Sequence, residues 1–416
     1  MKKSQKLKQI LLLLLLLTSY ISCKHDSGIL NLGDISAIGE NGLGPDSLDL
    51  LKINEIQLVA SHNSYRTKTD PSIFNFVQSI KGLLPSGLNP DGWDYEHPPF
   101  PQQLGNYKVR GLELDIYYDP NGGLFANRAG NLLVQKPVAS GLAELNYPGF
   151  KMLHIPDLDY NSNYLTFKAG LIALKEWSDA NPNHIPIFVN IETKEETPAS
   201  VVTSAIPFPI PGLIFTEAAL FDASAIKDLD EEIKSVFGIN LEKVFTPDEL
   251  RQNYPTLREA AMARNWPSLQ SMRGHIVFIM EGDAVDNYLE GGSSLEGKAS
   301  FVYSNSINKD YASFVILNNP VSDFNEIQEA VSKGFMVRTR SDSDTEEART
   351  NDYTNANSAI ASGAQIISTD YYRPDPRSAI PGSGWSDFKV ALPDGKMFRI
   401  NPVVAPDKFS TQQLTE

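Results

Sequence analysis

Acidic, amide and imidazole side chains lie in or directly after short apolar segments in the first half of the chain. Two carboxylates, Glu113 and Asp115, are two residues apart within the apolar run Val109–Tyr117, so both point to the same face of a strand. Carboxylates on one face repel each other unless a positive charge lies between them, and a hard divalent cation would meet that need. Four further side chains of this kind lie at the ends of other apolar runs: His62, Asn63, His154 and Glu192.

The chemistry of this set depends on which atoms it offers. Three carboxylates and the Asn63 carbonyl form an all-oxygen donor set, which suits calcium or magnesium better than zinc. Two histidines beside such an ion suit acid–base work on a phosphoryl group. The residue types therefore predict metal-assisted phosphoryl chemistry if the fold brings them together.

Each residue also has a purely structural interpretation. A single histidine at a strand end is commonly a hydrogen-bonded structural residue. The Glu113–Asp115 pair could be neutralised by Arg110 or Lys108, and Glu192 could be the acidic residue at the start of a helix. The combination favours a site, because all six residues lie at the ends of four successive predicted strands.

The elements that must position these residues follow from the apolar runs. A parallel sheet covered on both faces has continuous apolar strands, separated by helices. Helical patterns lie between most of the runs, at 163–179, 324–333 and 345–362, the last with Asp344 and Glu347 at capping-box spacing. The eight runs are Ile56–Ala60, Val109–Tyr117, Phe150–His154, Ile185–Ile191, His275–Met280, Phe314–Leu317, Gly334–Thr339 and Gln365–Ser368.

Eight such units predict an α/β fold, a TIM (β/α)₈ barrel, over residues 51–402. Long, proline-containing insertions fall near 66–108 and 193–273, and residues 403–416 form a C-terminal tail. Active sites of such barrels lie at the carboxyl ends of the strands, and consecutive strands are neighbours. We therefore expect the six residues to converge at one mouth of the barrel.

The ordered motifs resemble one enzyme family. His62-Asn-Ser-Tyr65, Glu113-Leu-Asp115, His154 and Asn190-Ile-Glu192 look like the catalytic signature of the calcium-dependent phosphoinositide phospholipases C, which have a barrel of the phospholipase C-like phosphodiesterase type. The segments 337–342 and 362–372 look like the last two strands of the bacterial branch of that family. The resemblance spans roughly residues 56 to 372.

The resemblance implies a role for each matching position. One calcium ion would be held by Asn63, Glu113, Asp115 and Glu192, with His62 and His154 beside the scissile phosphate. Lys194, Arg340 and Tyr372 would contact a phosphate or an inositol hydroxyl. The implied reaction cleaves phosphatidylinositol-type lipids to diacylglycerol and an inositol phosphate, through attack by the inositol 2-hydroxyl and acid–base catalysis by two histidines.

The first residues resemble an export signal. Four lysines precede the apolar run Ile10–Leu17, which is too short to span a bilayer, so 1–22 reads as a signal peptide. Cys23, the only cysteine, lies where a bacterial lipoprotein signal would be cut and lipidated. We expect residues 23–50 to form a tether and the protein to be exported to the cell envelope, held at a membrane by a lipid.

Charge and composition exclude some functions and leave others open. A formal net charge of −15 argues against a nucleic-acid partner, and we expect a monomer that acts on a phospholipid. Two alternatives stay open from the residues themselves. One is a glycerophosphodiester phosphodiesterase, which would share the barrel but typically carries Arg where this chain has Asn63. The other is a surface lipoprotein that binds a ligand without turnover.

Overall fold

A closed parallel barrel forms the body of the chain. The computed structural model describes residues 43–44, 47–84, 89–197 and 210–416. Eight parallel strands follow each other around the barrel in the order β1-β2-β4-β5-β6-β7-β8-β9, and β9 pairs with β1 again. Their bounds are β1 Ile56–Ser61, β2 Gly111–Asp119, β4 Ile187–Thr193, β5 Ile276–Gly282, β6 Phe301–Ser304, β7 Phe314–Ile316, β8 Met336–Arg340 and β9 Ile366–Thr369. The predicted TIM barrel is confirmed.

One predicted barrel strand takes a different place. The run around Phe150 forms β3 (Gly149–Met152), which pairs antiparallel with the outer half of β2, where Ile116 faces Met152. β2 pairs directly with β4, so β3 is not a barrel strand, and the assignment of His154 to the end of the third barrel strand is wrong. β6, a short strand that the apolar runs did not reveal, takes its place among the eight barrel strands, between β5 and β7. A further strand, β10 (Phe398–Ile400), runs antiparallel beside β1.

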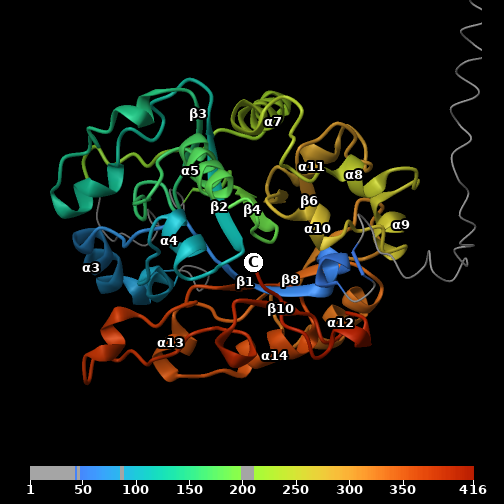
Figure 1. Cartoon of the computed structure of the whole chain (residues 1–416). Coiled ribbons are helices and arrows are strands. Elements are labelled where there is room, and N and C mark those ends of the chain that lie inside the picture. The colour runs from blue at the N-terminus through green and yellow to red at the C-terminus, as the bar shows by residue number, and fades with distance from the viewer. Residues whose placement is uncertain (1–42, 45–46, 85–88, 198–209) are drawn as a thin grey trace, which may run out of the picture. The chain divides into compact units, whose positions relative to one another are not determined.

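Helices surround the strands, as Figure 1 shows. α12 and α14 pack against β8, α11 packs against β5, and α5 and α7 pack against each other and against β3. Their apolar faces and the outward residues of the strands form one continuous core. The helices are α3 Pro71–Ser79, α4 Phe100–Gly105, α5 Phe167–Ala180, α7 Ala223–Phe237, α8 Pro247–Arg251, α9 Leu257–Met262, α10 Leu269–Met272, α11 Val285–Leu289, α12 Phe324–Ser332, α13 Glu346–Thr350 and α14 Thr354–Ser362.

The helix predicted over 345–362 is interrupted. α13 ends where Asn351 adopts a left-handed conformation (φ 59°), and α14 begins three residues later. The predicted capping box is also wrong. The cap position of α13 is Thr345 rather than Asp344, and Glu347 accepts a hydrogen bond from the Ser343 amide at 2.8 Å.

The two predicted insertions contain helices, and the C-terminal tail packs on the barrel. The insertion 66–108 contains α3, α4 and short 3₁₀ turns, and the insertion 193–273 contains α7 to α10. Residues 403–416 pack back on the barrel: Phe409 and Leu414 are buried, and the Glu416 side chain lies beneath the barrel against Arg110. The C-terminus accordingly lies at the centre of the view in Figure 1.

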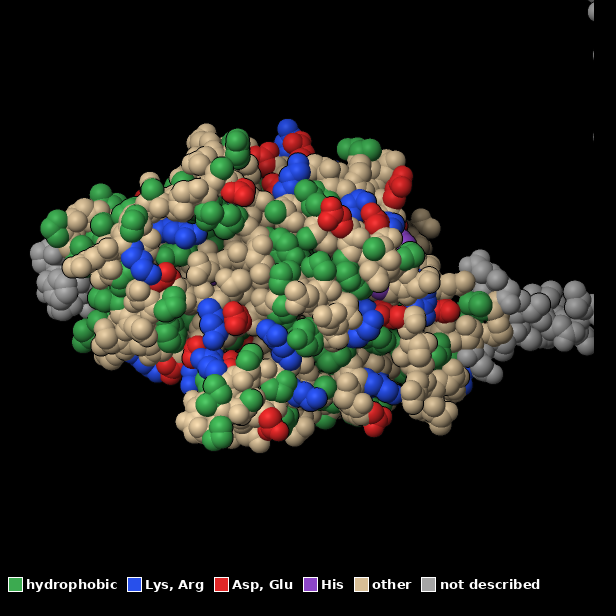
Figure 2. Space-filling view, turned by 60° about the vertical axis from the view of Figure 1, so that its left-hand side comes forward, with side chains coloured by type: hydrophobic (Ala, Val, Ile, Leu, Met, Phe, Trp, Pro, Cys, Tyr) green, Lys and Arg blue, Asp and Glu red, His purple; other side chains and the backbone are tan. Residues whose placement is uncertain are grey.

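Surface charge and helix length bear on the predicted contact with a membrane. On the face seen in Figure 2, basic side chains are interspersed with acidic ones. Among the described residues, each helix is too short or too polar to cross a bilayer. The predicted signal peptide, most of the tether and Cys23 lie outside the described residues.

Candidate functional site

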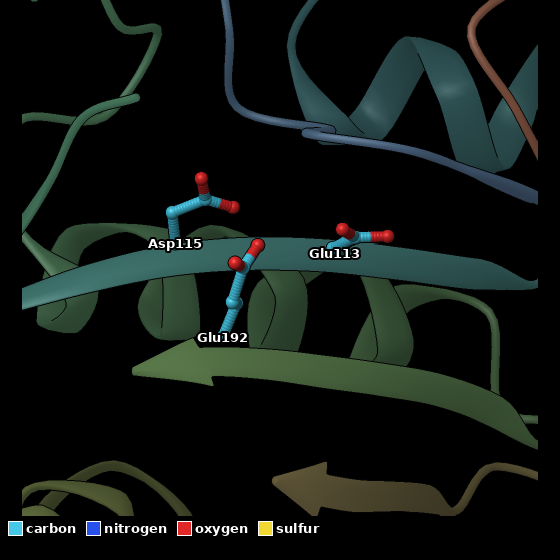
Figure 3. Close-up of side chains that lie close together, drawn as sticks. All are labelled: Glu113, Asp115 and Glu192. Carbon is cyan, nitrogen blue, oxygen red and sulfur yellow. The ribbon is translucent and has the colours of Figure 1, made fainter. Parts of the chain in front are cut away.

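Three carboxylates meet at one mouth of the barrel. β2 and β4 pair in parallel with Asp115 opposite Glu192 and Glu113 opposite Asn190. One oxygen from each of Glu113, Asp115 and Glu192 lies within 4.8 Å of the others. Figure 3 shows all three side chains rising from the same side of the two strands. The predicted convergence of these residues is therefore present in the structure.

Asp115 is the most deeply buried of the three. Burial raises its pKa well above the ordinary value, and the neighbouring charges of Glu192 and Glu113 raise it further. Lys194 opposes this effect, since its Nζ lies 2.7 Å from Asp115 Oδ2 and 3.6 Å from Glu192 Oε1. Lys194 therefore lies beside the carboxylates, and its predicted contact with a phosphate or an inositol hydroxyl stays a prediction.

The oxygens of this cluster fit a hard divalent cation. Two buried atoms, Asn63 Oδ1 and Asp115 Oδ1, have no hydrogen-bond partner within the part of the chain that the structure describes. The Asn63 amide nitrogen donates instead to the Tyr95 hydroxyl at 3.1 Å, which leaves the carbonyl oxygen as the available atom. Buried polar atoms are normally satisfied, so these oxygens are available to a ligand. The donor set is all oxygen, as calcium prefers.

Glu113 has an ionic partner inside the barrel. Arg338, on β8 across the barrel, donates to Glu113 Oε2, and the interaction is buried. Arg110 instead lies at the other end of β2 and pairs with Glu416, so it does not neutralise the two strand carboxylates. The structural interpretation that assigned Arg110 to them is wrong. Glu192 lies within β4, so it is not a helix-start residue either.

His62 is held from both sides of its ring. Its Nδ1 lies 2.7 Å from Asp370 Oδ1, and its Nε2 lies 2.8 Å from Arg340 Nη1. A guanidinium donates only, so Nε2 must accept and Nδ1 must carry the proton that Asp370 accepts. Burial and the charge of Arg340 lower the pKa of His62 well below its usual value, which agrees with a neutral ring.

His154 has an equivalent carboxylate partner. Its Nδ1 lies 2.8 Å from Asp159 Oδ2, which leaves Nε2 for a substrate. Burial lowers the pKa of His154 to about 4, although Asp159 favours the charged form. His154 follows β3, but it still comes close enough to His62 for its charge to affect the pKa of that ring.

Of the other two predicted substrate-binding residues, Arg340 lies at the site and Tyr372 lies behind it. Arg340 belongs to the site, because it contacts both His62 and Asp370. Tyr372 is buried beside His97, with its hydroxyl 3.2 Å from His97 Nδ1 and the two rings stacked. His97 in turn bonds the carbonyl oxygen of His62 at 2.8 Å. Contact of Tyr372 with a substrate therefore stays a prediction.

Several site residues were not predicted from the sequence. Glu281, at the end of β5, is the cross-strand partner of Glu192, and burial raises its pKa to about 7. Its position directly after an apolar run is the signal that identified Glu192, so the same rule could have found it. The same is true of Asp370, which follows β9. Tyr95 and Asp159 lie in loops and have no comparable signal.

Comparisons with known proteins add the following findings. A family model described as "Phosphoinositide phospholipase C, Ca2+-dependent" matches residues 51–402. No curated protein matches the chain. A similar solved structure is a calcium-dependent phosphoinositol-specific phospholipase C from Pseudomonas sp., at 16% identity and a TM-score of 0.49, covering 86% of this chain and 97% of that one. Another is a Ca²⁺-dependent phosphatidylinositol-specific phospholipase C from Streptomyces antibioticus, at 14% identity and a TM-score of 0.47. The match covers 79% of this chain and 96% of that one. A glycerophosphoryl diester phosphodiesterase from Parabacteroides distasonis is also similar, at 11% identity and a TM-score of 0.32, covering 85% and 95%.

Proposed function

The chain belongs to the family of calcium-dependent phosphoinositide phospholipases C, and we propose that it cleaves phosphatidylinositol-type lipids by acid–base catalysis with His62 and His154. One observation carries this proposal. Two histidines, each with Nδ1 bound to a carboxylate, lie at the mouth of the barrel beside a cluster of three further carboxylates. The products would be diacylglycerol and an inositol phosphate.

We propose that the site binds one calcium ion, with Asn63, Glu113, Asp115 and Glu192 as its ligands. The three carboxylates lie within reach of one ion, and the buried Asn63 carbonyl oxygen has no hydrogen-bond partner among the described residues. When bound, the ion would supply positive charge that neutralises the phosphate and lowers the pKa of the attacking inositol hydroxyl.

The protein residues would move the proton. The attacking hydroxyl oxygen forms a bond to phosphorus while the bond from phosphorus to the glycerol oxygen breaks. One imidazole, neutral at the start, would accept the hydroxyl proton at Nε2. The other would enter the step as imidazolium and donate its Nε2 proton to the departing glycerol oxygen, since the negative charge of the bound phosphate favours that charged form. Asp370 and Asp159 fix the ring orientation in each case, since each binds Nδ1. Nε2 of His154 is then left for the substrate, whereas Nε2 of His62 would exchange its hydrogen bond from Arg340 for one with the substrate.

Two cations would bind the negative charge of the phosphate or the head group. Arg340 contacts His62, and Lys194 contacts Asp115, so each cation lies beside a residue proposed to act on the phosphate or to bind the ion. A guanidinium beside the reacting imidazole can donate two parallel hydrogen bonds to the oxygens of a phosphate. Lys194 would hold an inositol hydroxyl or phosphate as a point charge.

A comparison of three substrates tests the function. Phosphatidylinositol, a glycerophosphodiester and sphingomyelin would be incubated with the protein in calcium, and again in chelator. We expect turnover of phosphatidylinositol that is lost in chelator and is restored by calcium better than by zinc. Preferential turnover of the glycerophosphodiester would support the alternative phosphodiesterase, and binding without turnover would support the non-catalytic lipoprotein.

We also propose that the enzyme acts from a lipid anchor at the cell envelope. The support is the position of Cys23 directly after the predicted signal peptide. Cys23→Ser should move the protein from the membrane to the soluble fraction, measured by fractionation and detergent phase partitioning. If the variant fractionates as wild type does, the anchor is not at Cys23.

A further inference from the structure

Arg66 is a buried cation that follows the strand-end motif directly. Its side chain has no exposed surface. Nε donates to Asp159 Oδ2 at 2.7 Å, Nη1 donates to the Tyr95 carbonyl at 2.6 Å, and Nη2 donates to Thr69 Oγ1 at 2.9 Å. Nη2 also donates to the Trp93 carbonyl. The guanidinium therefore joins three segments of the chain: its own loop, the 93–95 segment and the loop after His154.

One arm of this network leads to His154. Asp159 Oδ2 accepts from Arg66 and also binds His154 Nδ1 at 2.8 Å, while Thr69 donates to Asp159 Oδ1 at 2.7 Å. Burial alone would raise the pKa of Asp159, but Arg66 is the largest influence that keeps it low. Arg66 therefore keeps the carboxylate that orients His154 ionised and in place.

The other arm leads to His62. The Arg66 guanidinium carbon lies 4.5 Å from the centre of the Tyr95 ring, and the Tyr95 hydroxyl is 3.2 Å from His62 Nδ1. The same hydroxyl accepts from the Asn63 amide at 3.1 Å. The His97 amide also donates to the Arg66 carbonyl at 2.9 Å, which holds the 95–97 segment against the loop that follows β1.

We propose that Arg66 is the positioning residue that fixes the two histidines relative to each other, with Asp159 relaying its position to His154 and Tyr95 relaying it to His62. This inference rests on the proposed function, in which both imidazoles act on one phosphate. A planar fork with five donors can reach the carboxylate, the hydroxyl and the two carbonyls at once, whereas a lysine ammonium cannot reach all of them.

A second buried arginine gives a matched control. Arg110 also has no exposed surface, pairs with the carboxylate of Glu416, and donates to the backbone carbonyls of Leu104 and Val109. It lies at the opposite end of the barrel from the histidines. Arg66→Lys, Arg66→Gln, Arg110→Lys and Arg110→Gln therefore compare equal losses of buried hydrogen bonds near the site and far from it.

Two measurements apply to these variants after circular dichroism has established that each is folded. The first is kcat and KM on the phosphodiester that the wild type cleaves. The second is an NMR titration of labelled histidine, in which the His154 signal is assigned with His154→Gln. The charged groups that influence His154 are Asp159, Lys194 and Arg66, and Arg66 lowers its pKa.

We expect both Arg66 variants to lose roughly 10- to 100-fold in kcat with KM nearly unchanged, as for other residues that orient a reactive side chain. Arg66→Gln should also change the titration of His154, because it removes the positive charge that lowers the pKa of His154 and the group that keeps Asp159 ionised. The Arg110 variants should lower the melting temperature and leave kcat and the His154 titration as in wild type.

Arg66→Lys decides the inference if Arg66→Gln does not fold, because it keeps a positive charge beside Asp159. Wild-type kcat in a folded Arg66→Lys protein would overturn the proposal. An unchanged His154 titration in folded Arg66→Gln would also overturn it. Failure of the wild type to cleave phosphatidylinositol in calcium would refute the proposed function instead, and the histidine titration would still test the positioning role without substrate.

Discussion

Asp115 on β2 is the direct cross-strand partner of Glu192 on β4. β2 and β4 are neighbours in the barrel, and β3 pairs antiparallel only with the outer part of β2. Successive side chains alternate across a strand, so Glu113 falls on the same inner face as Asp115. The three carboxylates of the cluster follow from this one pairing.

Asp115→Asn should weaken calcium binding by at least roughly tenfold, because it removes a formal charge from the ion's oxygen ligands. The measurement is calorimetric titration with calcium. Asp119→Asn is the matched control, since Asp119 lies on the same strand and pairs with Lys151 at 3.1 Å, away from the cluster. Equal calcium affinity in both variants would show that Asp115 is not a ligand.

His154→Ala should leave calcium affinity nearly intact while turnover falls by about 10² to 10⁴, the usual contribution of a positioned acid or base. His154 binds Asp159 rather than the carboxylate cluster, so the ion's ligands are retained. Calorimetry and initial-rate kinetics on the same preparation separate the two effects. Near-normal turnover in this variant would remove His154 from the mechanism.

Asp370→Asn should lower kcat by roughly 10- to 100-fold at similar KM, because an amide can present its NH₂ group to His62 Nδ1 and favour the wrong tautomer. Asp370 accepts from that nitrogen at 2.7 Å in the wild type. Asp375→Asn provides the control, since Asp375 lies in the same loop but binds Arg377. The role assigned to Asp370 fails if both variants have the same kcat.

Gly111→Ala should destabilise the barrel at its closure by about 1 to 3 kcal/mol. β1 and β2 pair through Ala60 and Gly111, and a methyl group on Gly111 would lie 2.4 Å from the Ala60 Cβ. Urea denaturation measures the loss, and Ala60→Gly in the same protein should restore part of it. No gain in the double variant would mean that the contact does not limit closure.

His184→Gln tests a buried histidine outside the site. Burial lowers the pKa of His184 to about 4, and its ring bonds Ser178 Oγ at 2.7 Å and the Ile185 carbonyl at 2.6 Å. Below the ordinary value near 6.5, the unfolded chain takes up a proton that the folded chain does not, so this histidine lowers stability as pH falls toward 4.

The variant should therefore gain stability relative to wild type on acidification. Between pH 7 and pH 5 we expect the difference in unfolding free energy to move by roughly 2 kcal/mol in favour of His184→Gln. Urea denaturation at the two pH values measures it. A difference that is constant with pH would mean that His184 titrates normally.

Much of the site could be predicted from the sequence because its determinants are local. The two-residue period of a strand places Glu113 and Asp115 on one face whatever the strand pairs with. Polar residues directly after apolar runs identified His62, Asn63 and Glu192, because active sites of parallel barrels lie at strand ends. The same rule applied to two further runs would have added Glu281 and Asp370.

Strand partners were decided only by the tertiary structure. The run around Phe150 has the same apolar pattern as a barrel strand, and nothing in it specifies that β3 pairs antiparallel with β2. β6 is as short as β9, and an apolar run of this length does not by itself distinguish a strand from a loop. Strand direction and order depend on hydrogen bonds to distant segments, so local patterns do not determine them.

Charge partners were also decided in three dimensions. From the sequence, Arg110 and Lys108 were the cations nearest to Glu113, yet Glu113 pairs with Arg338 from across the barrel. Arg110 lies at the opposite end of its strand and pairs with Glu416. The energy of an ion pair decreases with the distance between the charges. The partner is therefore the cation that closure of the barrel brings close, whatever its distance along the chain.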